Sequence, residues 1–421
     1  MSDSDYLNRE QALDILGIKA ATLYSYVSRG FIRAIPQPGG RASFYLREDV
    51  EKAKARAEAR AGHGPVAASA MRWGEPVIQT GITEITEQGP RYRARLATDL
   101  ARQGASFEAV AEYLWSGHFY DGLHADEQVR WPSPALPAGV PDWLAQAASL
   151  HNSAHILQMM AAVTVALGIA EGTRGERVAS GATAVQSARR LIRALTGTFG
   201  FIGAQRAFYA LKEGEGITSG VLAALGRADE AEAHRAIDLA LVVCADHELN
   251  PTTFAARVAA STGADLHACI SAALGAHFGS LVGSMPDKIE DLFAQPVDEA
   301  AIIATLKRLT EAARSPPGFN HPGYPKGDPR AVLMIDTATQ VATKATRDDV
   351  QHLRTVIDAA NAQFGATPSI ELGLVVLSRA LGLPSRSACG LFALGRSAGW
   401  VAHVLEQRLA GFLIRPRAKF V

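Results

Sequence analysis

The spacing of apolar and polar residues divides the chain into a small mixed segment and a long helical body. Residues 9–16 and 20–27 carry apolar positions at helical spacing, and Gly17 interrupts the pattern between them. Short apolar runs at 31–35 and 43–46 flank a turn rich in proline and glycine, as the strands of a hairpin do. The first 60 residues are therefore predicted to form a helix, a turn, a second helix, a two-stranded wing and a charged third helix.

The body follows a stretch of small residues. Residues 61–72 combine alanine with glycine and proline, a composition typical of a flexible linker. Alternating residues at 76–85 and a short run at 91–93 indicate the two strands of a small hairpin. From Leu96 onward, alanine-rich apolar periodicity dominates, and prolines mark its breaks. The fold is therefore predicted to be mainly all-α.

Composition narrows the function classes. The 421 residues include 42 Lys+Arg and 42 Asp+Glu, so no overall positive field attracts nucleic acid or an anionic membrane. The chain starts with acidic and polar residues, and its most apolar stretch is too short to span a bilayer. Three scattered cysteines do not suggest a disulfide framework. We expect a soluble cytoplasmic protein without a membrane partner.

His247 is the residue with the clearest chemical signal. It stands between Asp246 and Glu248, at the end of an apolar helical run over 237–244. Flanking carboxylates can tune the pKa of an imidazole and hold its ring, which acid–base catalysis requires. The same arrangement also fits a buried histidine that only makes structural hydrogen bonds. The residues alone leave both interpretations open.

The sequence around His247 resembles a known family. Residues 245–262 are similar to the first catalytic-histidine segment of the citrate synthase family, and the resemblance extends from about residue 73 to residue 417. It implies an α-helical dimer whose active site lies in the cleft between a large and a small domain of each subunit. The implied large domain and small domain cover, respectively, residues 73–249 with 369–421 and residues 250–368.

Five residues match positions that carry chemistry in that family. The resemblance assigns His247 as the donor to the thioester oxygen of an acyl-CoA and Asp328 as the base that removes its α-proton. His321 would line the same cleft and contact substrate. Arg396 matches an arginine that binds an oxaloacetate carboxylate, and Arg415 matches one that reaches a carboxylate from the partner subunit; a guanidinium suits a carboxylate through paired hydrogen bonds. Without the resemblance, an Asp-Pro turn, a structural ion pair and a basic tail explain the same residues.

One family residue is missing. The family's second catalytic histidine lies in a Gly-Pro-Leu-His-Gly-Gly segment, and the corresponding stretch here is Gly-Ser-Leu-Val-Gly-Ser, with Val282 at the histidine position. Valine neither donates nor accepts a proton, and losing a positioned general acid costs about 10²–10⁴ in rate. His267 and His277 stand at other spacings, and His321 is a further substitute. Reduced or altered catalysis is therefore expected.

The N-terminal segment resembles a winged helix-turn-helix DNA-binding domain of the MerR and excisionase type. Its second predicted helix matches the recognition helix of that domain. The candidate DNA contacts on this helix and the wing are Thr22, Tyr24, Arg29, Arg33 and Arg41. Residues 1–60 hold ten basic and eight acidic residues, which is a weak positive footprint. A module for dimerisation or docking is the alternative.

The resemblance to the citrate synthase family implies an acyltransferase that condenses acetyl-CoA or propionyl-CoA with oxaloacetate to give citrate or methylcitrate, as in the tricarboxylic acid cycle. The acyl-CoA is a substrate, and no separate cofactor is expected. No metal is expected either, although His151 and His155 have a spacing that can bind one.

Two other interpretations stay open. The first is a weak or inactive pseudoenzyme that binds oxaloacetate or citrate and acts on DNA, or on an intact paralogue in a mixed dimer rather than a homodimer. The second is a structural subunit without a ligand. The preserved spacing of Asp328, Arg396 and Arg415 argues against this second interpretation.

Overall fold

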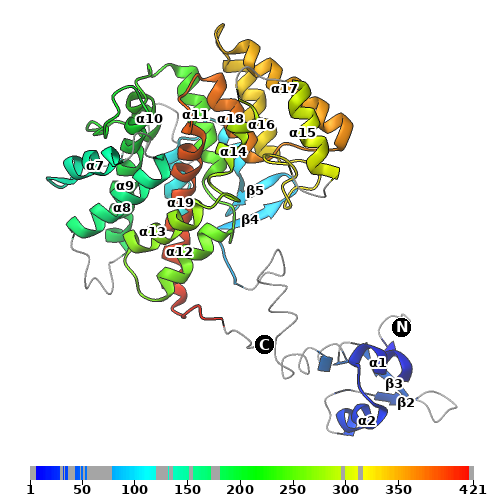
Figure 1. The fold of residues 1–421 in the computed structure, drawn as a ribbon. Coiled ribbons are helices and arrows are strands. Elements are labelled where there is room, and N and C mark those ends of the chain that lie inside the picture. The colour runs from blue at the N-terminus through cyan, green and yellow to red at the C-terminus, as the bar shows by residue number, and fades with distance from the viewer. Residues whose placement is uncertain are drawn as a thin grey trace. The chain divides into compact units, whose positions relative to one another are not determined.

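Two compact units make up the chain (Figure 1). The first lies within Met1–Gln79, and the second is Thr80–Pro416. The computed structural model describes residues 6–28, 32, 34–36, 43–47, 49–50, 53–54, 78–119, 131, 136–150, 155–171, 181–294, 299–311 and 316–416.

Two helices of the first unit lie where the sequence predicts them. They are α1 (Arg9–Leu16) and α2 (Ala20–Ser28). Asn8 and Gln11 form a reciprocal capping box at the start of α1, and Gly17 ends this helix with a φ of 61°, a conformation that glycine adopts without strain. The short break between the helices therefore follows from local sequence.

A three-stranded antiparallel sheet accompanies these helices. Its strands are β1 (Tyr6–Leu7), β2 (Ala34–Pro36) and β3 (Ser43–Leu46), in the order β1-β3-β2. The hairpin of β2 and β3 agrees with the predicted wing, whereas β1 was not predicted. Leu23 and Tyr45 belong to a separate apolar core in this unit. The predicted charged helix after residue 47 lies mostly outside the described residues.

The second unit begins with a small antiparallel sheet. Its strands are β4 (Thr83–Thr86), β5 (Gly89–Tyr92) and β6 (Arg95–Leu96), in the order β4-β5-β6. Thr86 pairs with Gly89, so a two-residue turn joins the first two strands. The hairpin was predicted, but β4 begins later than the predicted strand over 76–85.

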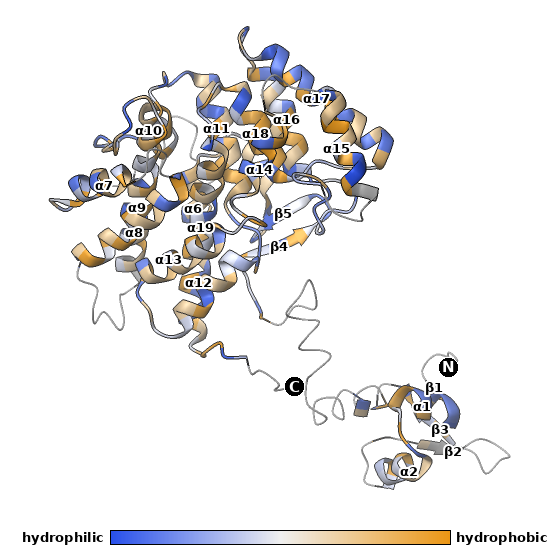
Figure 2. Cartoon of the chain, in the orientation of Figure 1, coloured by the Kyte–Doolittle hydropathy of each residue, from blue (hydrophilic) through white to orange (hydrophobic). Residues whose placement is uncertain are grey.

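Helices form most of the second unit, as predicted. They are α5 (Ala97–Arg102), α6 (Phe107–Ser116), α7 (Val140–Ser149), α8 (Ile156–Glu171), α9 (Gly181–Gly197), the 3₁₀ helix η1 (Thr198–Phe201), α10 (Ile217–Ala224), α11 (Ala231–Cys244), α12 (Pro251–Ser261), α13 (Leu266–His277), α14 (Met285–Leu292), α15 (Glu299–Glu311), α16 (Pro329–Val341), α17 (Arg347–Phe364), α18 (Ile370–Ala380) and α19 (Ser387–Ala410). Figure 2 shows that α7, α15 and α17 carry both hydrophilic and hydrophobic residues, the composition of amphipathic helices that bury one face.

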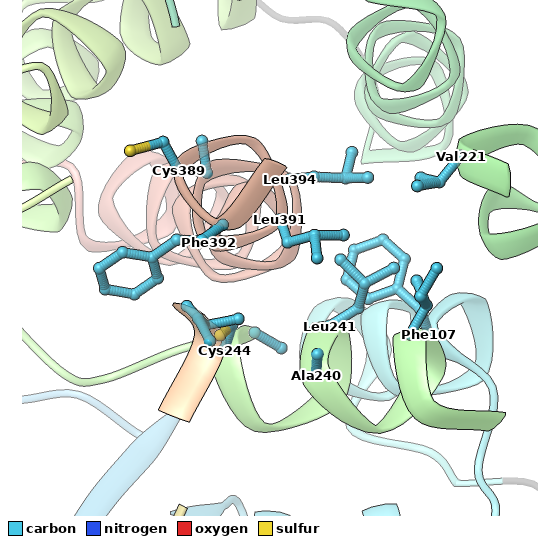
Figure 3. Packing of buried hydrophobic residues seen from close by; sticks show 14 of the residues in the cluster. Phe107, Val221, Ala240, Leu241, Cys244, Cys389, Leu391, Phe392 and Leu394 are labelled. Carbon is cyan, nitrogen blue, oxygen red and sulfur yellow. The ribbon is translucent and has the colours of Figure 1, made fainter. Parts of the chain in front are cut away.

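The long helix α19 forms the centre of this unit. It is long and apolar enough to cross a membrane by composition alone, but 94% of its most apolar window is buried in protein. Its Leu391 and Leu394 point toward Leu241, Phe107 and Val221 of neighbouring helices (Figure 3). The apolarity of α19 is therefore explained by its place in the core.

Glycines let α19 pass close to the end of α11. A Cβ atom at Gly395 would lie 2.7 Å from the Cβ of Cys244, and one at Gly399 would lie 2.2 Å from Oδ1 of Asp246. The Gly399 amide donates to the carbonyl of Ala245 at 2.9 Å. This close approach brings the backbone of α19 against the connection that carries His247.

Candidate active site

His247 lies in the short connection between α11 and α12. Asn250 ends this connection as the N-cap of α12, where its side chain accepts hydrogen bonds from the amides of Thr252 and Thr253. Glu248 has a φ of 53°, a left-handed conformation that is uncommon for residues with a side chain. The connection is thus a tight turn whose conformational cost its surroundings must offset.

A chain of buried polar side chains holds this connection in place. The Asp246 carboxylate pairs with Nε2 of His403 at 3.3 Å and accepts from the Glu248 amide at 3.1 Å. Arg257 donates to Nδ1 of His403 at 3.0 Å, and an arginine can only donate. The proton of the His403 ring is therefore on Nε2, facing Asp246. These hydrogen bonds hold the backbone on the N-terminal side of His247 in place.

The His247 ring packs against two residues from the segment before α16. Its Nε2 shares a hydrogen bond with the Tyr324 hydroxyl at 3.1 Å, and its ring centre lies 5.1 Å from that of His321. Burial lowers the pKa of His247 well below its usual value, and the nearby Arg330 and Arg396 lower it further. Burial likewise lowers the pKa of His321 to about 4. Both imidazoles are therefore neutral at physiological pH, and each can donate one hydrogen bond.

Asp328 and Arg330 form a two-point ion pair inside the protein. Nε of Arg330 donates to Oδ1 of Asp328 at 3.0 Å, and Nη2 donates to Oδ2 at 2.8 Å. Asp328 is also the N-cap of α16, because it accepts the Arg330 amide. Among the residues that the structure describes, Nη1 of Arg330 is buried without a hydrogen-bond partner. That orphaned donor is suited to an incoming anion.

Arg396 reaches the same region from α19. Its Nε donates to the carbonyl of Cys244, at the end of α11, over 2.8 Å. Its guanidinium carbon lies 5.0 Å from the ring centre of Phe392, one helical turn earlier. Burial lowers the pKa of Arg396, and Asp246 opposes this change. Two buried guanidinium groups therefore influence the same imidazole, that of His247.

Glu371, near the start of α18, is a carboxyl group that the sequence did not single out. Its hydrogen-bond donor is the hydroxyl of Ser369. Burial raises its pKa, and both Asp328 and Arg330 act on it electrostatically. A buried carboxyl group with a raised pKa is a candidate proton acceptor. It lies more than 40 residues beyond Asp328 and follows no motif recognised in the sequence, so only the fold reveals it.

The arrangement combines three chemical capacities. His247 and His321 offer neutral hydrogen-bond donors, Arg330 and Arg396 offer buried positive charge, and Glu371 offers a carboxyl group with a raised pKa. Burial strengthens each of these interactions relative to water. Such a site fits a small dicarboxylate beside a carbon acid whose enolate needs a neutral donor.

Comparison with known proteins decides the family. Residues 70–417 match the family model described as citrate synthase, C-terminal domain. The chain belongs to the citrate synthase family. The family predicted from the sequence around His247 is thereby confirmed. The N-terminal segment before residue 70 lies outside the match.

Named relatives include citrate and 2-methylcitrate synthases. The chain is 30% identical to a 2-methylcitrate synthase of Shewanella oneidensis over 205 residues, which is 47% of this chain and 52% of that enzyme. That match thus spans about half the length of the relative. A Mycobacterium tuberculosis protein whose name places it among the citrate synthases is 27% identical over 83% of this chain and 91% of its own length.

Solved citrate synthases share the fold. The enzyme of Thermoplasma acidophilum, in a ternary complex with carboxymethyl coenzyme A and oxaloacetate, superimposes with a TM-score of 0.70 at 24% identity, over 82% of this chain and 94% of that one. The enzyme of Thermotoga maritima gives a TM-score of 0.68 at 23% identity, over 83% and 94%. These likenesses confirm the predicted helical citrate synthase fold of the body. The division of the body into large and small domains stays a prediction.

The remaining predicted residues lie in different places. Val282 is half-buried in the turn after α13, and its amide donates to the carbonyl of Gly279. Arg415 is exposed on the segment after α19, and the structure records no contact between Arg415 and His247. In the first unit Tyr24 is exposed and Thr22 is half-buried, both on α2. Arg29, Arg33 and Arg41 lie outside the described residues, as does His151.

Among the described residues, one group has ligand atoms close enough to hold a metal: His155, Asp287 and Cys389, within 4.8 Å of one another. Nδ1 of His155 accepts the Leu157 amide at 3.2 Å, so the ring proton is on Nε2, which donates to Asp287 at 2.7 Å. A ligating nitrogen must be free of its proton, and metal-bound histidines usually donate from the other nitrogen. The group therefore fits a hydrogen-bonded link between α8, α14 and α19.

Proposed function

We propose that the protein condenses an acyl-CoA, acetyl-CoA or propionyl-CoA, with oxaloacetate to give citrate or methylcitrate. The observation that carries this proposal is the convergence of His247, His321, Arg330 and Arg396 in one buried site. Family membership and the names of the relatives support the reaction class. The acyl-CoA acts as a substrate, and the proposal includes no metal or separate cofactor.

The site supplies groups for enolate formation and for substrate binding. A neutral His247 donates its N–H to the thioester oxygen as the enolate forms, and this hydrogen bond stabilises the oxyanion. Arg330 and Arg396 hold the carboxylates of oxaloacetate, and the free Nη1 of Arg330 is the donor that such a carboxylate satisfies. His321, beside His247, contacts the substrate that lies between them.

Two carboxyl groups are candidates for the base that removes the α-proton. The family resemblance predicts Asp328, but its carboxylate accepts three hydrogen bonds from Arg330. Both of its oxygens are therefore occupied by the guanidinium. Glu371 has a raised pKa and accepts from Ser369. We therefore assign proton removal to Glu371 and the positioning of Arg330 to Asp328.

Exchange of the acyl α-protons separates these assignments. In deuterium oxide, with oxaloacetate present, Glu371→Gln should abolish deuterium uptake into acetyl-CoA, while Asp328→Asn should weaken oxaloacetate binding. Exchange that survives in Glu371→Gln and disappears in Asp328→Asn, with oxaloacetate still bound, would restore Asp328 as the base. Mass spectrometry of the products from acetyl-CoA and propionyl-CoA tests the reaction itself and identifies the preferred acyl group.

Val282 favours a slower enzyme over an efficient one. Its side chain offers no proton at the position where the family has a histidine, so turnover reduced by about 10²–10⁴ is expected. The pseudoenzyme that binds oxaloacetate or citrate is the second candidate, and the same observation supports it. Product formation by the unmodified chain decides between the two.

The N-terminal unit supports a separate proposal of DNA binding. Tyr24 is 49% exposed on α2, and the Arg9 guanidinium lies 5.7 Å from its ring centre. A basic group of α1 thus lies beside an aromatic group of α2, the helix that matches a recognition helix. Such proteins usually bind as pairs, which agrees with the dimer that the role of Arg415 requires. Fluorescence anisotropy with random duplex DNA, for the full chain and Tyr24→Ala, tests this: equal and salt-independent binding would contradict it.

A further inference from the structure

His277 is a buried histidine that the proposed reaction has not yet used. It is the last residue of α13, and its side chain is fully buried. Among the described residues, neither Nδ1 nor Nε2 has a hydrogen-bond partner. A buried polar group without a partner is costly and rare, so it calls for a ligand or another compensating role.

The ring of His277 lies on the face of α19 that carries Arg396. Its centre is 5.0 Å from that of Phe392 and 5.4 Å from that of Trp400. Phe392, Arg396 and Trp400 are four residues apart in turn, so they share one face of the helix. The Arg396 guanidinium lies 5.0 Å from the centre of the same Phe392 ring. The imidazole and the guanidinium thus pack against the same aromatic ring.

The turn that contains Val282 also holds His277. A Cβ atom at Gly283 would lie 2.2 Å from a carbon of the imidazole ring, so only glycine leaves room for it. The Gly283 amide donates to the carbonyl of His277 at 2.9 Å. The imidazole therefore packs directly against Gly283, the residue after Val282.

Arg396 is the charged group that acts on His277 electrostatically. Burial, together with the smaller effect of Arg396, lowers the pKa of His277 to about 3. The ring is neutral and carries one N–H donor and one acceptor lone pair. An N–H group that packs against the same ring as a buried guanidinium suits an oxygen of an anion that the guanidinium binds.

We propose that His277 contacts the 2-oxo acid bound at Arg396, donating a hydrogen bond to its oxygen in place of the histidine missing at position 282. The inference deepens the proposed condensation and rests on its choice of oxaloacetate as substrate. The contact polarises the bound 2-oxo acid and requires no change in the protonation of His277.

A matched pair of substitutions on α13 tests this contact. His267 is also buried on α13, and its ring nitrogens likewise lack hydrogen-bond partners among the described residues, but it packs against Gly168 instead of the Arg396 face. Calorimetry with oxaloacetate alone should show affinity reduced about 10–100-fold in His277→Phe and unchanged in His267→Phe, the loss expected for one hydrogen bond to a charged group. Equal effects, or no effect of His277→Phe, would overturn the proposal.

Two further measurements keep the test decisive. If His277→Phe folds poorly, His277→Asn replaces it, and the pKa of His277 in histidine-labelled wild-type protein should rise when oxaloacetate binds. An unchanged pKa, or a wild-type chain that does not bind oxaloacetate, would overturn the contact. Calorimetry needs no acyl-CoA, so a wild-type chain that binds oxaloacetate through His277 but forms no product would contradict the condensation alone.

Discussion

Asp328 accepts hydrogen bonds from Arg330 through both carboxylate oxygens, from Nε at 3.0 Å and from Nη2 at 2.8 Å, and both side chains are buried. The pair leaves Nη1 of Arg330 without a partner among the described residues. Desolvating two charges is costly, and a buried pair contributes little net stability unless its remaining donors are satisfied. The arrangement is therefore better suited to binding an anion than to stabilising the fold.

Asp328→Asn should destabilise the protein strongly. It leaves the Arg330 charge buried without its counter-ion, which costs about 3–5 kcal/mol. Chemical denaturation of the second unit measures the change. Asp336→Asn is the control, because the Asp336–Arg354 pair is exposed at 3.7 Å and an exposed pair contributes under about 1 kcal/mol. Equal losses in both variants would contradict the role given to the buried pair.

Gly399→Ala should inactivate the site while the fold persists. The added Cβ would lie 2.2 Å from Oδ1 of Asp246, so the connection that carries His247 must move. Displacement of that backbone by even about 1 Å is expected to cost on the order of 10²-fold in rate. Gly275→Ala is the matched control within a helix, since no atom lies within 4 Å of its added Cβ. Steady-state kinetics and thermal melting of both variants check this expectation.

The neutral histidines of the site should make the protein sensitive to acid. Burial lowers the pKa of His321 to about 4, below the value of about 6.5 in the unfolded chain. The unfolded chain therefore binds more protons between pH 6.5 and 4, and this contribution to stability is lost as pH falls through that window. Unfolding at pH 7 and pH 5 should show a smaller difference in His321→Gln than in wild type. An equal difference would mean that His321 is not held neutral.

His234 should make the stability of the protein fall as pH rises, the reverse of the effect of His321. Hydrogen bonds from its ring to Asp238 and Asp229, at 3.2 and 2.8 Å, raise its pKa to about 9. A raised pKa stabilises the fold fully below about pH 6.5, and the contribution is lost as pH rises toward 9. Wild type should lose more stability than His234→Gln between pH 7 and 9. The NMR titration of labelled His234 checks the pKa directly, and a midpoint near 6.5 would contradict it.

The sequence predicted the fold class and part of the site for identifiable reasons. Helical periodicity located α1 and α2 closely, because these helices bury one regular face, whereas the apolar run over 237–244 marked only the C-terminal part of α11 (Ala231–Cys244). His247 and Arg396 were recognised from the sequence motifs that contain them, and the fold places both in one region. β1 was missed because a two-residue strand carries no periodic signal, and β4 was placed too early because an alternating pattern does not show where pairing starts.

Side-chain geometry and tertiary packing explain what the sequence did not reveal. The ion pair of Asp328 with Arg330 depends on side-chain geometry, although the two residues are neighbours in sequence. Glu371 acquires its raised pKa only through burial and the charges that folding brings to it. The spacing of His277 from Val282 argued against a shared role, but the turn between them folds back against the His277 ring. Each of these properties arises from tertiary packing.

Release of CoA thiol from acetyl-CoA and propionyl-CoA, dependent on oxaloacetate, tests the central claim most directly. Wild type should release thiol slowly, Val282→His should release it faster by up to about 10²–10⁴, and Arg396→Leu should release none. The last variant removes a guanidinium whose Nε is bound to the carbonyl of Cys244 beside His247. Absence of oxaloacetate-dependent release from both wild type and Val282→His would contradict the proposal that this site condenses an acyl-CoA with oxaloacetate.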